Sequence, residues 1–583
     1  MTDKPRASRR PAWSRLAVVL CVGLSIRLYL ALTAALLSRD GVTFIWYAQK
    51  LSADPAGAMR AEKQHPLYPA MILGAHRVIQ AAGGMFRPLS GSVGAVLDDP
   101  VRCWTLAGMS VTLAGGLAVI VAVYALAALL FDRRVGVIAA GLAALAAEFC
   151  QLSADALSDM PHLALYLFSL CCGVRALRSD AAREPGGNAR GCSPRAALGW
   201  LFLAGALSGL AYLVRPEGSG AGLVAAIGTL IWARTWPPRR RLAGCAVVCL
   251  GVALMACPYM IVTGKIVQKK SILKFFSNDA AGTRFMRFEN RSQIPGSQLP
   301  VPSSRFSVSG FQFPAVLRPP VGALGGSWPR DLFRAGGLLL EHWCRAMRVA
   351  FLLPAILWLL MPRRRAAAEG LAVRLVAAGG ALHIVVSLAL ILRFNYWELF
   401  SVRHAAILAA LTLPFSAAGL AGGPALAPAV AARLGRNALT ALLLAGLTAP
   451  TLPWMLEKRN AAELHLRRAG EWIRTQQPAG AKVHTNRFTV AFYANGEWLW
   501  SPDEDDVGRA GVLDRVLVEA RVRHPDWLVF DERRMMRISP TFFTDLEGRR
   551  LPGETIERAA VSEHDAKRAR QRAIVYRYRP PPS

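Results

Sequence analysis

The chain has 583 residues, of which 53% are hydrophobic and only 18% are charged. This balance excludes disordered and fibrous proteins, because such chains lack the apolar side chains to bury. The formal net charge is +31, but residues 457–583 hold 23 Lys and Arg against 19 Asp and Glu and contribute only +4. The other positive charge lies between long apolar runs, which is typical of cytoplasmic loops of a membrane protein and not of a nucleic-acid groove.

Long apolar runs recur through residues 1–457. A hydrocarbon core of about 30 Å needs about 20 apolar residues as a helix. We therefore expect an all-α polytopic membrane module with about 11 transmembrane helices. The expected spans are Leu16–Leu37, Val101–Phe131, Val135–Leu152, Pro161–Leu177, Ala197–Val214, Gly218–Ala233, Leu242–Val262, a run ending at Met361, Leu371–Leu392, Ala405–Leu420 and Ala438–Met455.

The arginine clusters predict one orientation. Basic residues precede the first run, so we expect a cytoplasmic N-terminus, and no small-residue cleavage site follows that run, so we expect an anchor and not a cleaved signal. The expected location is the bacterial cytoplasmic (inner) membrane, with extracytoplasmic loops at 38–100 and 263–334. Alternation then places these clusters in the cytoplasm: Arg133–Arg134, Arg175 to Arg195, Arg234 with Arg239–Arg241, Arg363–Arg365 with Arg374, and Arg433 with Arg436.

Residues 66–82 are apolar enough to be an additional span, which would reverse every later cluster. The segment contains two prolines and carries His76 and Arg77 in its second half. These features favour a helix that lies in the membrane interface.

Residues 458–583 are expected to form a small extracytoplasmic α/β domain. No cysteine follows Cys344 and no CxxC motif occurs, so we expect neither a disulfide framework in this domain nor a zinc site. The patterns predict helices over 461–476 and 512–522, and strands over 481–486, 490–494, 527–531 and 573–579.

Asp40 is the first candidate for chemistry, because it follows the first span by two or three residues. A carboxylate at the membrane surface can accept a proton from an incoming hydroxyl or amine. The alternatives are a solvated loop residue or the N-cap of a helix over 42–51. Further along, Lys63 and His65 could face a phosphate at the interface, or their block could simply begin an interfacial helix at Pro66.

Polar residues also stand at the outer ends of later spans. Asp155 and Asp159 are four residues apart and, with His162, could bind a divalent metal or a substrate cation, or else cap the next span. Arg215 and Arg403 could each clamp a lipid-linked phosphate, or anchor at the interface by snorkelling. Two polar residues lie in mid-span and are expected to make helix–helix contacts: Arg27 and His383.

Taken in order, these blocks resemble the bacterial family 39 glycosyltransferases of the C-type fold, which are relatives of protein O-mannosyltransferases and of the lipid A aminoarabinose transferase. The resemblance is carried by three blocks, Ser38-Arg39-Asp40-Gly41, His65-Pro66-Leu67-Tyr68-Pro69 and Leu157-Ser158-Asp159-Met160-Pro161. Arg215-Pro216-Glu217-Gly218 and Ser401-Val402-Arg403-His404 are similar to further blocks of such proteins. The chain departs from the mannosyltransferases in having Gly41 where they have Glu, and His-Pro-Leu for His-Pro-Pro.

The resemblance implies a GT-C-like integral-membrane glycosyltransferase. Such an enzyme moves a hexosyl or pentosyl group from a polyprenyl-phosphate donor to an extracytoplasmic acceptor, with inversion. By the same resemblance, Asp40 would activate the acceptor and Asp159 would be a second acidic site residue. The expected partners are the donor, an unidentified glycan, lipid or protein acceptor and membrane lipids; a divalent metal stays open. The implied substrate- and phosphate-binding residues are Lys63, His65, Arg215, Glu217, Tyr396 and Arg403.

Two other classes compete with this interpretation. A secondary transporter or lipid flippase would line a path with intramembrane charges that face one another. A non-catalytic assembly protein would use its C-terminal domain to bind a partner, and Asp40 would then be dispensable. Polar groups gathered at one membrane face favour the transferase.

Overall fold

The structure is a computed structural model. It describes residues 10–62, 64–86, 98–181, 193–264, 328–348, 350–360, 367–394, 400–422, 430, 432, 435–457, 460–500, 512–549, 554–566 and 569–581. Several of the predictions fall outside this part of the chain. They concern Lys63, Tyr396, most of the loop 263–334, and the arginines Arg363–Arg365 and Arg433.

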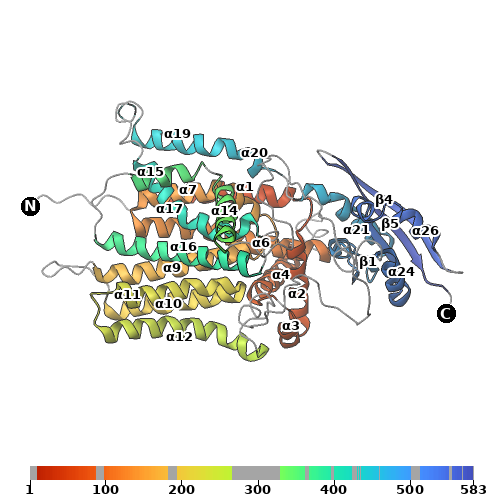
Figure 1. Cartoon of the computed structure of the whole chain (residues 1–583), viewed down its shortest axis with the longest axis horizontal. Coiled ribbons are helices and arrows are strands. Elements are labelled where there is room, and N and C mark those ends of the chain that lie inside the picture. Colours follow the sequence, from red (N-terminus) through yellow and green to blue (C-terminus); the bar gives the residue numbers. More distant parts are fainter. Residues whose placement is uncertain are drawn as a thin grey trace, which may run out of the picture.

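The described part of the chain forms a helical bundle and a small α/β domain, and α1 begins at the end of the bundle opposite to that domain (Figure 1). The helices that run along the bundle are α1 (Arg10–Thr33), α6 (Pro100–Leu130), α7 (Arg133–Leu145), α9 (Asp159–Ala181), α10 (Pro194–Val214), α11 (Ser219–Trp232), α12 (Pro238–Thr263), α15 (Leu352–Leu360), α16 (Ala367–Phe394), α17 (Ala406–Gly422) and α19 (Arg436–Thr448). Short helices α8 (Ala147–Leu152) and α20 (Leu452–Met455) extend α7 and α19.

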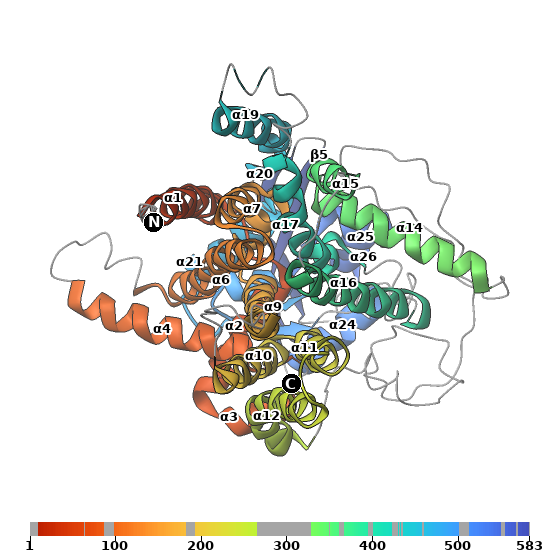
Figure 2. The ribbon, with the colours of Figure 1, turned by 90° about the vertical axis from the view of Figure 1, so that its left-hand side faces the viewer.

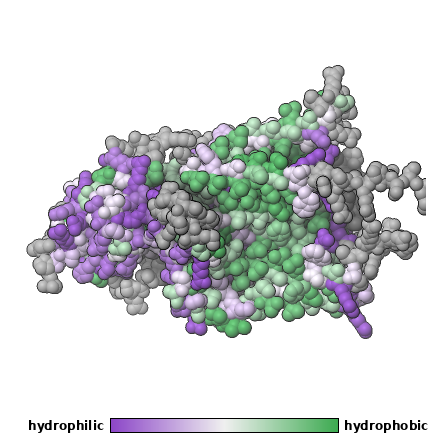
Figure 3. All heavy atoms as spheres, turned by 180° about the vertical axis from the view of Figure 1, so that it is seen from behind, coloured by the Kyte–Doolittle hydropathy of each residue, from purple (hydrophilic) through white to green (hydrophobic). Residues whose placement is uncertain are grey.

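Eight of the described helices are long and apolar enough to cross a membrane, namely α1, α6, α9, α10, α12, α16, α17 and the segment from α19 to α20. An apolar surface covers the bundle between the hydrophilic α/β domain and the opposite end (Figure 3). The chain is therefore a multi-pass membrane protein. The three other expected spans correspond to shorter helices, α7 with α8, α11, and α15, so the total of eleven stays a prediction.

The described arginine clusters share one end of the bundle. Asp99 caps the start of α6 and pairs with Arg474 of the α/β domain at 2.8 Å. Because α6 runs away from that domain, α7, which begins at Arg133, starts at the far end of the bundle, where α1 also begins. This arrangement agrees with one common side for these clusters; which side faces the cytoplasm stays a prediction.

Two helices lie across the bundle, α4 (Leu67–Phe86) and α14 (Trp328–Ala346) (Figure 2). Helix α4 contains most of the ambiguous segment 66–82. Its crosswise course, at the end of the bundle next to α2 (Arg39–Ala53) and α3 (Pro55–Ala61), is that expected of an interfacial helix.

The α/β domain contains one five-stranded sheet of order β2-β1-β3-β5-β4. Strand β1 is parallel to both β2 and β3, and β5 is antiparallel to β3 and β4. The strands are β1 (Lys482–Thr485), β2 (Glu497–Trp500), β3 (Trp527–Asp531), β4 (Thr555–Ala566) and β5 (Ala569–Arg579), and the helices are α21 (Leu464–Gln476), α22 (Phe488–Tyr493), α24 (Val512–Arg523), α25 (Glu532–Ile538) and α26 (Phe542–Gly548).

Most predicted elements of this domain are confirmed, with one error. Residues 490–494, predicted as a strand, belong to the helix α22. Every residue of α22 is buried, so its apolar run shows neither the alternation of a half-exposed strand nor the stripe of a surface helix. Strands β2 and β4 and helices α25 and α26 were not predicted.

The α/β domain holds the chain where α1 ends. The Leu37 amide donates to the Tyr493 hydroxyl at 3.0 Å, the Asn460 amide donates to the Leu36 carbonyl at 2.9 Å, and Arg467 donates to the Ala35 carbonyl at 3.0 Å. Peptide groups past a helix end need such partners when they are shielded from water. The domain therefore fixes the segment that leads into α2.

Arg27 makes a helix–helix contact, as predicted, and is fully buried. Its guanidinium donates to the carbonyls of Ala143 and Ala144 at 3.2 and 3.0 Å, to its own helix at Gly23, and to Ser153. Helix α7 ends at Leu145, so two of these carbonyls belong to its last turn, where a cation is favourable. Arg27 thus stabilises the break between α7 and α8.

We predict that Arg27→Met destabilises the bundle by about 1–3 kcal/mol or more, because buried carbonyls lose their donors. The measurement is thermal unfolding in lipid nanodiscs. Ser25→Ala is the control, since this hydroxyl only bonds Cys21 of its own helix at an exposed position. Equal melting temperatures for wild type and Arg27→Met would contradict this role.

Candidate functional site

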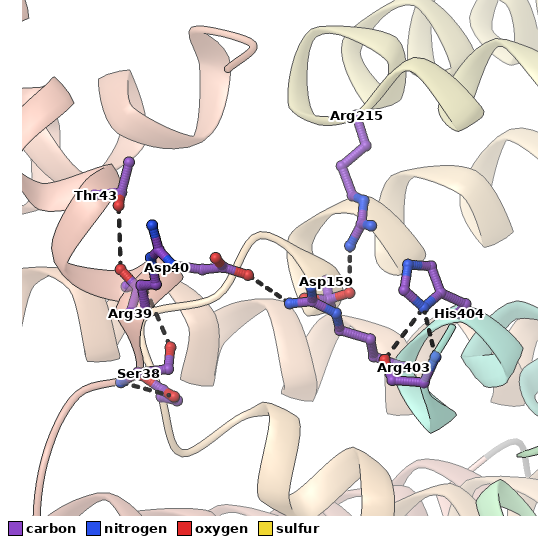
Figure 4. A network of polar contacts seen from close by, with 11 residues as sticks. Ser38, Arg39, Asp40, Thr43, Asp159, Arg215, Arg403 and His404 are labelled. Atoms are coloured by element: carbon purple, nitrogen blue, oxygen red, sulfur yellow. Dashed lines mark hydrogen bonds and ion pairs between the residues drawn. The ribbon is translucent and has the colours of Figure 1, made fainter. Parts of the chain in front are cut away.

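Two acid–arginine pairs lie close together (Figure 4). They stand where α9 begins and α10 ends, at the end of the bundle that faces the α/β domain (Figure 1). Asp40, in the first turn of α2, accepts from Arg403 at 2.5 Å. Asp159, at the start of α9, accepts from Arg215, which follows the last residue of α10. The predicted site residues therefore come together from four separate segments, with Arg403 on the short helix η2 (Val402–Ala405).

Burial distinguishes the two pairs. The side chains of Asp40 and Arg403 are 44% and 36% exposed, whereas those of Asp159 and Arg215 are 6% and 16% exposed. An exposed pair contributes roughly 0–1 kcal/mol, because water screens it. Removing one partner of a buried pair costs about 3–5 kcal/mol, because the other charge is left unpaired. The first pair can therefore open readily, and the second resists opening.

Arg215 also has a second carboxylate nearby. Its Nε lies 3.7 Å from Glu217 Oε2. Burial alone would lower the pKa of Arg215, but the carboxylates of Asp159, Glu217 and Asp40 raise it above its ordinary value. The guanidinium therefore stays charged and supplies a fixed positive field at the cluster.

The start of α2 is held by Asp155, a residue of the turn before α9. The carboxylate of Asp155 accepts from the Ser38 amide at 3.1 and 3.2 Å and from the Ala156 amide at 2.8 Å. Ser38 in turn caps α2, because its hydroxyl accepts from the Gly41 amide at 3.2 Å. Asp40 is therefore not the cap, and its carboxylate is left to face Arg403.

Gly41 explains one departure from the mannosyltransferase pattern. A Cβ atom at this position would lie 3.1 Å from Asp155 Oδ1 and 3.2 and 3.3 Å from atoms of Ala156. Such contacts are shorter than ordinary van der Waals separations, so a side chain here would push α2 away from the turn. The glycine lets the two segments approach.

Arg403 is positioned by a local cap. The Ser401 amide donates to His404 Nδ1 at 3.1 Å, and the His404 ring stacks on Phe400 with centroids 5.1 Å apart. His383 Nε2 lies 2.7 Å from the His404 carbonyl oxygen, which confirms the predicted helix–helix contact of His383, here between α16 and η2. The capping of η2 by Ser401 and His404 was not predicted from the sequence. Its signal was present, because Ser401 stands three residues before the polar side chain of His404, which is the spacing of a capping box.

Other predicted residues lie elsewhere. The His65 ring is only 1% exposed and packs against Tyr212 and Tyr259, with centroids 4.9 and 5.3 Å away, so its role at a phosphate stays a prediction. Asp155 and Asp159 bind different partners, and in the described part of the chain no three His, Cys, Asp or Glu side chains form a metal-like group.

Comparison with known proteins relates the chain to solved structures alone. No family model and no curated protein matches it. ArnT from Cupriavidus metallidurans bound to undecaprenyl phosphate matches with a TM-score of 0.54 and 15% identity, over 97% of each chain. Its apo form gives 0.53 and 15%, over 98% of each. The oligosaccharyltransferase AglB from Archaeoglobus fulgidus, in complex with an inhibitory peptide and a dolichol-phosphate, gives 0.52 and 14%, over 91% of this chain and 70% of that one.

These likenesses extend over nearly the whole chain, from the bundle through the C-terminal domain. At such low identity they establish the fold, and the reaction that the chain catalyses must be inferred from its site residues. The chain has the GT-C-like fold of ArnT and AglB, as the sequence resemblance implied.

We predict that Asp159→Asn lowers stability far more than Asp40→Asn does, by about 3–5 kcal/mol against less than about 1 kcal/mol. Unfolding of both variants in nanodiscs provides the measurement. A larger loss for Asp40→Asn would show that the two pairs have been assigned the wrong roles.

We also predict that Asp155→Ala loosens the start of α2, because it removes both carboxylate oxygens that accept from the Ser38 amide. Loss of this acceptor should speed hydrogen exchange of the Ser38 and Gly41 amides by roughly 5- to 150-fold, corresponding to about 1–3 kcal/mol. Hydrogen-exchange mass spectrometry of the peptide spanning 36–46 measures this. Unchanged exchange would mean that Asp155 does not hold α2.

Proposed function

We propose that the chain is a family 39-type glycosyltransferase of the bacterial inner membrane. It would transfer a hexosyl or pentosyl group from polyprenyl phosphate to an acceptor at the extracytoplasmic face, with inversion. The observation that carries the proposal is the accessible Asp40–Arg403 pair, in which residues 363 positions apart meet at 2.5 Å. One group can accept a proton and the other can hold a phosphate.

The exposed Asp40–Arg403 pair can separate when the donor binds. When a donor phosphate binds Arg403, the guanidinium leaves Asp40 at a cost of roughly 0–1 kcal/mol, because the pair is exposed. The same event frees the Asp40 carboxylate for the acceptor. The buried Asp159–Arg215 pair keeps its geometry and adds positive charge from Arg215 near the leaving group.

In the proposed step, the acceptor hydroxyl oxygen bonds to the anomeric carbon while the bond from that carbon to the phosphate oxygen breaks. The hydroxyl proton passes to Asp40, and the electron pair of the broken bond remains on the phosphate, beside Arg403. Attack from the side opposite to the leaving group inverts the anomeric carbon. Lys63, His65, Glu217 and Tyr396 remain proposed substrate contacts that this step does not require.

The donor class is supported by the bound lipids of proteins with this fold. ArnT was solved with undecaprenyl phosphate and AglB with a dolichol-phosphate. A polyprenyl tail keeps its phosphate at the membrane boundary, and the cluster lies at the end of the apolar bundle. The side that carries the α/β domain is the proposed extracytoplasmic side, since the described arginine clusters lie at the other end.

The transporter alternative is less well supported. It would need charges that face one another across a path within the bundle. Arg27 instead donates to the carbonyls of Ala143 and Ala144 and to Ser153, and His383 contacts the backbone of His404. Both serve packing between segments.

We predict that purified protein in nanodiscs releases undecaprenyl phosphate from at least one member of a panel of undecaprenyl-phosphate sugars. Asp40→Asn should lower the rate by about 10²–10⁴-fold, because the proton acceptor is lost, while the protein stays folded. Asp54→Asn is the matched control: Asp54 is exposed and caps α3, and Asn caps equally well. Equal rates for wild type and Asp40→Asn would refute the proposed role.

A further inference from the structure

Helix α2 exposes every third residue along its central length. Asp40, Thr43, Trp46 and Gln49 are partly exposed. The two residues within each interval are buried, namely Gly41 and Val42, Phe44 and Ile45, and Tyr47 and Ala48. Between Asp40 and Gln49 the helix is therefore enclosed by protein except along one line of four side chains.

That line is continuous. Residues three apart are neighbours on a helix surface, and each step turns back by about 60° around an axis with 3.6 residues per turn. The three steps add up to about 180°, so the four side chains form one ridge that winds halfway around α2, from Asp40 to Gln49 on the opposite side. The ridge advances about 13.5 Å, at 1.5 Å per residue. The ridge begins at the carboxylate that pairs with Arg403 and ends at Gln49.

The far end of the ridge opens into a pocket between the bundle and the α/β domain. Helix α2 supplies Trp46 and Gln49, α6 supplies Trp104, and the other wall belongs to the α/β domain. The main lining residues are Trp46, Gln49, Trp104, Phe492, Asn495 and Gly496. Neither part of the protein forms the pocket alone.

The aromatic walls are held in place by their neighbours. Trp46 stacks on Trp498 with centroids 6.0 Å apart and lies 5.5 Å from Phe488. The Trp104 ring is stacked on His76 at 3.7 Å, with the planes only 8° apart. Aromatic faces held in place at a domain boundary are typical of ligand sites.

The polar groups of the pocket are uncharged. Its lining offers the carboxamides of Gln49 and Asn495 and the indole N–H groups of two tryptophans. Within the described residues, the Gln49 amide and both of these indole N–H groups make no hydrogen bond to the protein. Nearby Asp99 is already paired with Arg102 at 3.2 Å and Arg474 at 2.8 Å. Such a lining suits a neutral ligand with hydroxyl groups and apolar ring faces, and not a phosphate.

We propose that this ridge and pocket form a subsite for a neutral sugar unit of the acceptor. Resting on the proposed glycosyltransferase function, the subsite binds a part of the acceptor that lies about 9–14 Å along α2 from the hydroxyl at Asp40, at 1.5 Å per residue, and about a third to half a turn around the helix. The acceptor is then a glycan or glycolipid with at least one sugar beyond the reacting one. The pocket selects it by stacking on Trp46 and Trp104 and by hydrogen bonds to Gln49 and Asn495.

Binding of neutral trisaccharides tests the subsite without requiring turnover. Maltotriose, cellotriose and chitotriose are added to the full-length protein in nanodiscs, and saturation-transfer NMR detects the bound sugar protons. At least one trisaccharide should bind wild type, and Gln49→Ala and Asn495→Ala should each weaken binding at least fivefold. Gln476→Ala, the same substitution at an exposed position outside the pocket, should bind like wild type.

Three results would overturn the subsite: no binding of any of the three sugars, equal binding by the pocket variants and wild type, or displacement of the sugar by phosphatidylglycerol added at equal concentration. The last result would identify the tryptophans as lipid anchors. If sugars bind at the pocket while no undecaprenyl-phosphate sugar is ever consumed, the subsite stands and the proposed function fails.

Discussion

The buried pair of Asp159 and Arg215 joins the start of α9 to the end of α10 at the boundary of the apolar bundle. A charge there without its partner would cost several kcal/mol, so both segments must end at that depth. The turn before α9 carries Asp155, which holds the start of α2 through the Ser38 amide. The position of Asp40 thus depends on a turn that also leads directly into the buried pair.

The α/β domain also holds α2 and the segment that leads into it. Its hydrogen bonds to the peptide groups of residues 35–37 replace those lost where α1 ends. Its aromatic side chains Phe488 and Trp498 pack on Trp46 of α2. The helix that carries Asp40 is therefore held between the turn before α9 and the C-terminal domain, and between Asp40 and Gln49 only the ridge remains exposed. Rigid support of this kind keeps reacting groups close to productive geometry.

Hydrophobic patterns predicted most helices of the bundle, because an apolar run of about 20 residues usually forms a membrane-spanning helix. These patterns did not reveal that α7 ends at Leu145, where Arg27 donates to the carbonyl groups of its last turn. The contact between Arg27 and Ala144 joins residues 117 positions apart, so no local pattern predicts it. The error at 490–494 has a similar cause, because a segment buried on all sides loses the periodicity that separates helix from strand. Asp40 and Asp159 were predicted from their position after or before a span. Their partners Arg403 and Arg215 were predicted as separate clamps, and only the tertiary structure pairs each with its acid.

The most direct test of this account is a cryo-EM structure of the protein in nanodiscs with undecaprenyl phosphate. We predict a lipid phosphate within hydrogen-bond distance of Arg403, an Asp40 carboxylate released from Arg403, and an intact Asp159–Arg215 pair. A phosphate bound at the opposite end of the bundle, or bound while Asp40 remains paired with Arg403, would contradict it.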